Sequence, residues 1–294
     1  MASISPTFFI VGAPKAGTTS LYRYLEEHPD VFMSHIKETN FFSFEEIKAQ
    51  GLYYHEEHIS TLEEYNRLFA KVSNEKAIGE ASVSYLFYDT VPKKIYEFNP
   101  EAKIIMVLRN PVDRGYSHYL MDKRMGLVKK PYEGIVNSDR NTQKDRLYYQ
   151  QYVELGQYYE QVKRYLHIFA PEQVKIIFFE ELRNNPSQLI TDIYNFLNVD
   201  ITFRPDVDRK HNTFKKPKNN VIKALYQNSR VRKAAGRLTP GIVKNKLQEK
   251  LFNREDKLVL TNSLRMSLQE IYQDDIIQLE KLLDVNLSHW FKAS

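Results

Sequence analysis

Residues 7–27 read TFFIVGAPKAGTTSLYRYLEE, and they set the architecture expected for the whole chain. The segment begins with an apolar run, continues through a loop with two glycines, and then takes helical spacing until His28-Pro29. A strand that enters a helix through such a loop directs free backbone N–H groups and the positive end of the helix dipole at one point. The segment therefore predicts an anion-binding loop within an α/β fold.

The rest of the chain repeats this alternation of short apolar strands and helices. Strands are predicted at 7–11, 30–33, 76–79, 103–108 and 174–179, and helices at 18–27, 91–98, 157–169 and 186–197. Alternating strands and helices are typical of a mostly parallel sheet that is covered on both faces. We expect a P-loop-like three-layer fold with a central parallel sheet flanked by helices. Residues 1–294 are expected to form a single domain, with a basic loop region at 206–241 and a C-terminal helical tail at 254–294.

Composition excludes some classes of site and leaves others open. The chain has no cysteine, which rules out disulfides and thiolate metal sites. The net charge of +5 is compatible with anionic ligands but does not identify one. No secretory leader and no apolar run of membrane-spanning length is visible, so we expect a cytoplasmic protein without a membrane partner.

The lysine of the loop lies at an unusual position. Gly12 and Gly17 have the spacing of a Walker A loop, but Thr18 follows the second glycine where that loop has lysine. Lys15, three positions earlier, can instead lie beside a bound phosphate on its leaving-group side. A plain turn between a strand and a helix is the alternative reading of the glycine spacing alone.

Residues 14–21, PKAGTTSL, resemble the 5′-phosphosulfate loop of sulfotransferases that use 3′-phosphoadenosine 5′-phosphosulfate (PAPS). The motif is most similar to heparan-type glycan and bacterial sulfotransferases. The resemblance implies PAPS as donor, 3′,5′-adenosine bisphosphate (PAP) as product, and no required metal. It also implies that Lys15 contacts the bridging oxygen and stabilises the leaving group. The donor would be bound by Lys15, Ala16, Gly17, Thr18, Thr19 and Ser20.

A second anchor for the donor follows the predicted strand at 103–108. Arg109 stands at the strand's carboxyl end and Ser117 lies eight residues later, which matches the family's 3′-phosphate motif. Either residue alone could be structural. The segment 209–217 falls where family members place a basic loop, and it adds Lys210, Lys215 and Lys216 as further candidates. A solvated basic loop is the alternative there.

Transfer to a hydroxyl needs a base for the acceptor's proton. Residues 37–42, KETNFF, resemble the heparan-type segment in which the glutamate is the proposed base, and this assigns the role to Glu38. His35 and His118 are rival bases, and a structural ion pair of Glu38 with Lys37 is the alternative. Ala81 stands where heparan-type relatives have a lysine, which puts specificity for such glycans in doubt.

Two other functions fit parts of the pattern. In a P-loop kinase that uses Mg-ATP, Glu180-Glu181 after the predicted strand at 174–179 could hold the metal, but the missing lysine after Gly17 counts against it. Nucleic-acid binding is disfavoured because the five tyrosines within 148–159 have helical spacing, which is typical of a core or a cleft wall. With Lys123, Arg124, Lys129 and Lys130 they could instead line a cleft for a small-molecule or glycan acceptor. The oligomeric state cannot be read.

Overall fold

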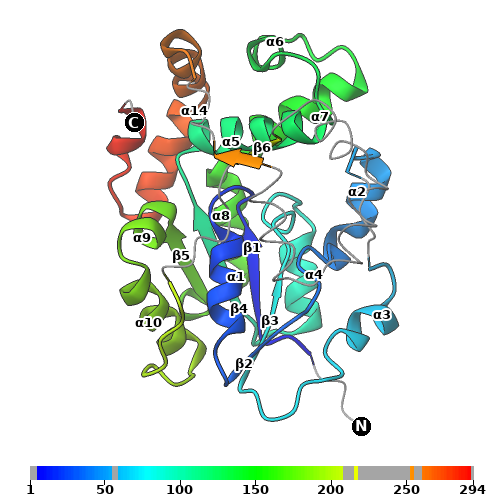
Figure 1. The fold of residues 1–294 in the computed structure, drawn as a ribbon, viewed down its shortest axis with the longest axis vertical. Coiled ribbons are helices and arrows are strands. Elements are labelled where there is room, and N and C mark those ends of the chain that lie inside the picture. The colour runs from blue at the N-terminus through cyan, green and yellow to red at the C-terminus, as the bar shows by residue number, and fades with distance from the viewer. Residues whose placement is uncertain (1–4, 55–58, 208–214, 218–251, 255–259, 293–294) are drawn as a thin grey trace.

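A computed structural model describes residues 5–54, 59–207, 215–217, 252–254 and 260–292. Its centre is a five-stranded parallel sheet of order β2-β3-β1-β4-β5, which confirms the predicted α/β class (Figure 1). The strands are β1 (Phe8–Gly12), β2 (Val31–Met33), β3 (Ala77–Ala81), β4 (Lys103–Leu108) and β5 (Val174–Phe178). Each lies within two residues of its predicted bounds at either end.

Helices flank the sheet and close it off from solvent (Figure 1). They are α1 (Thr18–Glu26), α2 (Phe44–Gln50), α3 (Leu62–Arg67), α4 (Val91–Phe98), α5 (Pro111–Met125), α6 (Tyr132–Val136), α7 (Gln143–Tyr152), α8 (Tyr158–Ile168), α9 (Phe179–Asn184), α10 (Pro186–Leu197) and α14 (Asn262–Leu283). In Figure 1, α9 and α10 lie beside β5 at one edge of the sheet, and α2 and α3 lie at the opposite side.

Local sequence explains where these elements begin and end. The strand residues Ile104–Leu108 are all fully buried, as a parallel sheet covered on both faces requires. Pro186 occupies the first turn of α10, where its missing N–H costs no hydrogen bond. α4 ends before Asn99-Pro100, because a residue that precedes proline is disfavoured in the helical conformation.

The parallel sheet brings the predicted motifs to one edge. β1 ends at the glycine loop and β4 ends at Arg109, and these two strands are hydrogen-bonded neighbours with Phe8 opposite Lys103. β3, on the other side of β1, ends just before Ser82 and Val83. The carboxyl ends of neighbouring parallel strands form the usual ligand-binding edge of an open α/β sheet.

The predicted basic loop region and helical tail differ from the structure in one respect. Lys215–Pro217 (β6) and Phe252–Arg254 (β7) pair as an antiparallel two-stranded sheet, which the polar, proline-containing sequence did not indicate. The tail is helical from Asn262, and α14 packs against α8 and α5. Lys210 lies outside the described residues, as do the side chains of Lys215 and Lys216, so their predicted phosphate contacts stay predictions.

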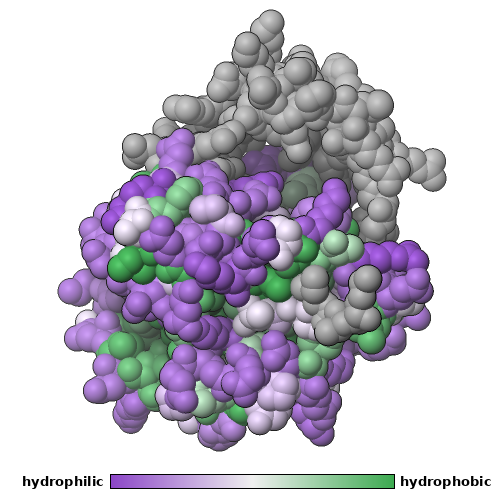
Figure 2. Space-filling model, turned by 90° about the horizontal axis from the view of Figure 1, so that it is seen from below, coloured by the Kyte–Doolittle hydropathy of each residue, from purple (hydrophilic) through white to green (hydrophobic). Residues whose placement is uncertain are grey.

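The described surface is mostly hydrophilic on the face seen from below, where hydrophobic residues form small areas separated by polar ones (Figure 2). Charged residues make up 27% of the chain, which fits such a surface. Within the described ranges, no helix combines the length and the apolar character that crossing a bilayer requires.

Candidate active site

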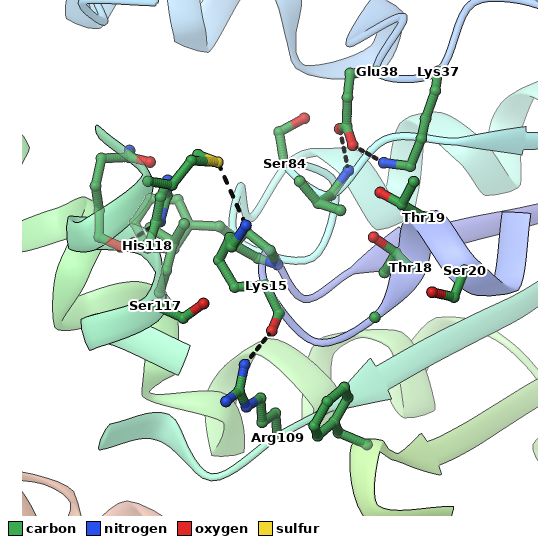
Figure 3. Close-up of a pocket in the computed structure, with 18 of the residues that line it drawn as sticks. Lys15, Thr18, Thr19, Ser20, Lys37, Glu38, Ser84, Arg109, Ser117 and His118 are labelled. Carbon is green, nitrogen blue, oxygen red and sulfur yellow. Dashed lines mark hydrogen bonds and ion pairs between the residues drawn. The ribbon is translucent and has the colours of Figure 1, made fainter. Parts of the chain in front are cut away.

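A cavity of about 670 Å³ collects the three predicted motifs. Lys15 comes from the glycine loop, and Glu38 comes from the segment after β2. Arg109 directly follows β4, and Ser117 lies on α5. In Figure 3, Lys15 lies between Glu38 on one side and Arg109 on the other. The fold therefore brings together residues that are up to about a hundred positions apart in the sequence.

The loop itself leaves several polar groups for a ligand. Gly17 is the N-cap of α1 with φ 98°, a left-handed conformation in which no side chain caps the helix. A Cβ at Gly17 would lie 2.7 Å from Leu182 Cδ2, so a side chain there would clash. The hydroxyls of Thr18, Thr19 and Ser20 line the cavity and make no hydrogen bond to the described residues. Such a helix N-terminus suits an anionic group.

Ala16, also predicted to bind the donor, does not reach the cavity. It is fully buried, and its N–H donates to the carbonyl oxygen of Ala13 at 3.2 Å. Its contribution is to the shape of the loop rather than to the lining.

Lys15 and Arg109 are linked through the loop backbone. Lys15 has φ 67°, and its Nζ lies 3.4 Å from Met121 Sδ of α5. Arg109 Nη1 donates to the carbonyl oxygen of Lys15 at 2.9 Å, while its guanidinium lies over the Phe179 ring with its carbon 4.6 Å from the centroid. One donor of Arg109 thus fixes the loop, and its other N–H groups have no partner among the described residues. Ser117 Oγ, also on the cavity wall, is equally without a hydrogen bond to them.

Glu38 is held at the opposite wall of the cavity (Figure 3). Its Oε2 accepts a hydrogen bond from the backbone N–H of Val83 at 2.8 Å, and its Oε1 forms an ion pair with Lys37 Nζ. The backbone of Glu38 has φ 64°, and its N–H donates to the carbonyl oxygen of Ala81 at 2.8 Å. With its side chain 24% exposed, Glu38 retains access to a ligand. It provides the sole carboxylate among the described lining residues.

A buried carboxylate, which sequence reasoning missed, supports the segment around Glu38. Glu80 is fully buried, and its Oε1 accepts hydrogen bonds from Ser82 Oγ at 2.6 Å and Thr39 Oγ1 at 2.9 Å. Ser82 Oγ in turn accepts from the backbone N–H of Asn40 at 3.0 Å, and Asn40 Nδ2 donates to the carbonyl oxygen of Glu38 at 3.1 Å. The chain of hydrogen bonds fixes two left-handed residues, Glu38 and Asn40. Residues 79–85 resemble a heparan-type segment, but that pattern does not indicate this supporting role of Glu80, because its partners Thr39, Tyr65 and Ser82 come from three segments.

We expect Glu80→Gln to change the pH dependence of stability. Burial raises the pKa of Glu80 to about 7, so the folded state binds this proton more tightly than the unfolded chain. The contribution of Glu80 to the free energy of unfolding of the wild type therefore falls as the pH rises from about 4.5 to 7. Glutamine does not ionise, so the variant does not show this decrease. The free energy of unfolding of the variant minus that of the wild type should rise by about 3 kcal/mol across this interval. Urea denaturation at both pH values measures it, and a constant difference would contradict the assignment.

The rival bases are in less suitable positions. His35 is exposed and is not among the cavity-lining residues. His118 lines the cavity, but its Nδ1 lies 3.1 Å from the carbonyl oxygen of Gln151 and its Nε2 lies 2.7 Å from the hydroxyl of Tyr54. Burial and the positive charges of Arg114 and Lys15 hold the pKa of His118 well below its usual range. Both ring nitrogens are engaged, so neither is open to an acceptor.

The tyrosines of the segment 148–159 belong to the core, while Gln150, Gln151 and Leu155 of the same segment line the cavity. Tyr148, Tyr149, Tyr152 and Tyr158 are buried in the hydrophobic core and do not line the cavity, so of the two alternatives for these tyrosines the core is the one observed. The ring of Tyr152 on α7, for example, packs against His118 and Tyr119 of α5. Of the four basic residues predicted beside them, Arg124 reaches the cavity.

The two glutamates that could hold the metal ion of a kinase, Glu180 and Glu181, are not placed to do so. Glu181 Oε1 accepts a hydrogen bond from the backbone N–H of Phe178 at 3.0 Å, which makes it a cap of α9. Glu180 and Glu181 are not among the lining residues. Across the described part of the chain, no three His, Cys, Asp or Glu residues are grouped as metal ligands.

Comparisons with known proteins agree with this arrangement. The family model described as "Sulfotransferase domain" matches residues 5–284. A sulfotransferase from Alicyclobacillus acidocaldarius is 32% identical, with a TM-score of 0.75 over 98% of this chain and 100% of that one. The sulfotransferase domain from the curacin biosynthetic pathway shares the fold at 15% identity, with a TM-score of 0.52 over 97% of this chain and 100% of that one.

Among curated proteins, the bifunctional heparan sulfate N-deacetylase/N-sulfotransferase 2 of Bos taurus is 32% identical over 217 residues, which are 69% of this chain and 24% of that protein. The human N-deacetylase/N-sulfotransferase 1 is 26% identical over 288 residues, which are 95% of this chain and 29% of that protein. The chain thus spans about a quarter of the length of these relatives. With a family model that covers nearly all of its residues, the chain belongs to the sulfotransferase family.

Proposed function

We propose that this sulfotransferase moves a sulfuryl group from PAPS to a hydroxyl or amine of an acceptor by in-line displacement. One observation carries the proposal: Lys15, Glu38, Arg109 and Ser117 line the same cavity at the carboxyl edge of the sheet. Membership of the sulfotransferase family gives the reaction class independently of that geometry.

The donor side of the cavity fits a nucleotide with phosphate groups at both ends. Thr18, Thr19 and Ser20 offer hydroxyls at an uncapped helix N-terminus, which suits the 5′-phosphosulfate. Arg109 and Ser117 offer charged and hydroxyl donors to the 3′-phosphate. Hydroxyls that open into the cavity beside the guanidinium of Arg109 are available to hydrogen-bond an anion there.

The chain's residues divide the chemistry between the two sides of the transferred group. PAPS, when bound, supplies the electrophilic sulfuryl group and a phosphate leaving group. Glu38 takes the acceptor's proton as the new S–O or S–N bond forms. Lys15 donates to the bridging oxygen as the S–O bond to phosphate breaks, which stabilises the charge that develops on PAP. Lys37 and the N–H of Val83 orient the Glu38 carboxylate for this step.

The acceptor side is proposed more broadly. Some relatives are named for heparan sulfate N-sulfotransferase activity, which supports a glycan acceptor. A small-molecule acceptor is the other possibility that we propose. A role for Mg-ATP is not favoured, since Glu38 already pairs with Lys37 and no second carboxylate lines the described cavity. The single-domain organisation and the cytoplasmic location expected from the sequence stay predictions.

We expect Arg109→Ala to weaken donor binding more than turnover. The wild type should prefer PAP to adenosine 5′-phosphate because Arg109 binds the 3′-phosphate, and the variant should lose about 2 kcal/mol of that preference. Calorimetric titration of both nucleotides into both proteins gives the difference directly. Equal losses for the two nucleotides would mean that Arg109 acts through the loop carbonyl of Lys15 instead.

A transfer assay tests the proposed function itself. The purified chain is incubated with PAPS carrying radioactive sulfur, a panel of alcohol, phenol, amine and sugar acceptors, and a chelator of divalent metals. Label in an acceptor is expected without added metal. Transfer of radioactive phosphate from ATP, with no transfer from PAPS, would contradict it.

A further inference from the structure

Few charged residues of the described cavity lining remain for an acceptor once those that serve the donor or pair with each other are set aside. Lys15 and Arg109 are assigned to the donor, Arg183 follows Leu182, which lies against Gly17 of the donor loop, and Lys37 is paired with Glu38. Arg124 is the further cation of the described lining. Most of the wall is apolar or aromatic and includes Ile47, Leu52, Val83, Phe87, Met121 and Met125. An acidic glycan would bury carboxylates or sulfates against this wall, which is costly without matching cations.

Outside the donor motifs, the described lining includes a polar side chain without a hydrogen-bond partner. Gln151 lines the cavity and is 5% exposed, yet its side-chain amide makes no hydrogen bond to the described residues. Its amide atoms are not among the fully enclosed polar atoms of the described residues, so they open into the cavity, where a ligand can pair with them. The neighbouring Gln150 differs, because its Nε2 donates to Gln50 Oε1 at 3.1 Å.

The backbone of Gln151 is held in place from behind. Its carbonyl oxygen accepts from Arg114 Nη1 at 3.0 Å and lies 3.1 Å from His118 Nδ1, while Arg114 Nη2 donates to the carbonyl oxygen of Tyr152 at 2.9 Å. Gly115 allows this approach, since a Cβ there would lie 2.1 Å from the same Tyr152 oxygen. Gln151 therefore presents its amide from a fixed support, as a specificity residue must.

We propose that Gln151 anchors the acceptor and that the acceptor is an uncharged, hydroxylated molecule with an apolar face, of the neutral glycoside class. An amide both donates and accepts hydrogen bonds, which matches a hydroxyl, whereas a carboxylate or sulfate can only accept. The apolar wall covers the carbon face of such a molecule while Glu38 addresses the reacting hydroxyl. This inference rests on the proposed function and narrows its acceptor.

The first test compares acceptors in matched pairs. Each pair consists of a neutral glycoside and the glycoside of the corresponding uronic acid with the same aglycone, such as phenyl glucoside and phenyl glucuronide. The set contains both monosaccharide and oligosaccharide pairs. We expect kcat/KM to be about tenfold or more higher for the neutral members. Preference for the uronic acids would overturn the inference. PAP binding on the same preparations separates the two failures: a protein that binds PAP but prefers uronic acids refutes this inference alone, whereas one that binds no PAP refutes the proposed function.

The second test assigns the anchor. Gln151→Met keeps the length of the side chain and should raise KM for the neutral acceptor about tenfold, with PAP affinity and Tm unchanged. Gln161→Met is the matched control: Gln161 is buried away from the cavity, and its Nε2 donates to the carbonyl oxygens of Glu154 and Gln157 at 3.2 and 2.6 Å. The control should lower Tm and leave KM unchanged. If Gln151→Met lowers Tm and leaves KM unchanged as well, its role is structural and the proposal fails.

Discussion

Lys15→Ala is expected to lower kcat about 10²–10³-fold, the usual effect of removing one donor from a site where negative charge develops. The ammonium lies on the loop between Glu38 and Arg109 (Figure 3), where the bridging oxygen of the donor would be bound. Affinity for PAP should fall much less, because Arg109, Ser117 and the hydroxyls of the loop still bind the two phosphate ends. Transient kinetics at saturating PAPS isolates the chemical step from donor binding.

A matched control separates the loss of this ammonium from a general loss of charge. Lys93 lies on α4 with its side chain 75% exposed, and it is not among the cavity-lining residues. Lys93→Ala should therefore leave kcat and PAP affinity unchanged. Wild-type turnover in Lys15→Ala would remove Lys15 from the leaving-group role.

Glu38→Gln is the second large effect, with an expected loss of about 10²–10⁴-fold in kcat, the range for removal of a general base. Glutamine keeps the size of the side chain and can still accept the hydrogen bond from the N–H of Val83. It cannot take a proton at neutral pH, so the chemical step slows while the segment keeps its shape. PAP affinity, measured by calorimetry on the same preparations, should not change.

The control for this variant is Glu172→Gln, at an exposed glutamate outside the cavity. It should behave as the wild type in both measurements. An unchanged rate in Glu38→Gln would remove Glu38 as base and return attention to His118, although both ring nitrogens of His118 are engaged by Tyr54 and Gln151.

Much of the fold could be predicted because the parallel strands are short, apolar and bounded by breakers. The strand Lys103–Leu108 and the helices Val91–Phe98 and Pro186–Leu197 have their predicted bounds, since proline or asparagine marks their ends. The strands β6 and β7 were missed because each has three residues and their pairing is not local. Hydrophobic periodicity cannot detect elements of that length.

The site residues that were predicted from motifs lie together around the cavity. Residues whose role depends on contacts with distant segments were missed. Lys15, Arg109 and Glu38 follow strands, and parallel strands place their carboxyl ends together. Glu80 lies in a segment that resembles a heparan-type motif and Gln151 lies in none, but the role of either residue depends on its neighbours in space. The sequence alone does not reveal that the carboxylate of Glu80 is fully paired or that the amide of Gln151 has no partner among the described residues.

The central claim is that the cavity binds a nucleotide with a 3′-phosphate and needs no metal to do so. The most direct test is calorimetric titration of the chain with PAP and with ATP, each in the presence of a chelator and again with Mg²⁺. We expect tight binding of PAP that is independent of Mg²⁺, and weak or no binding of ATP. Tight binding of Mg-ATP with no binding of PAP would contradict the sulfuryl-transfer function and favour a P-loop kinase.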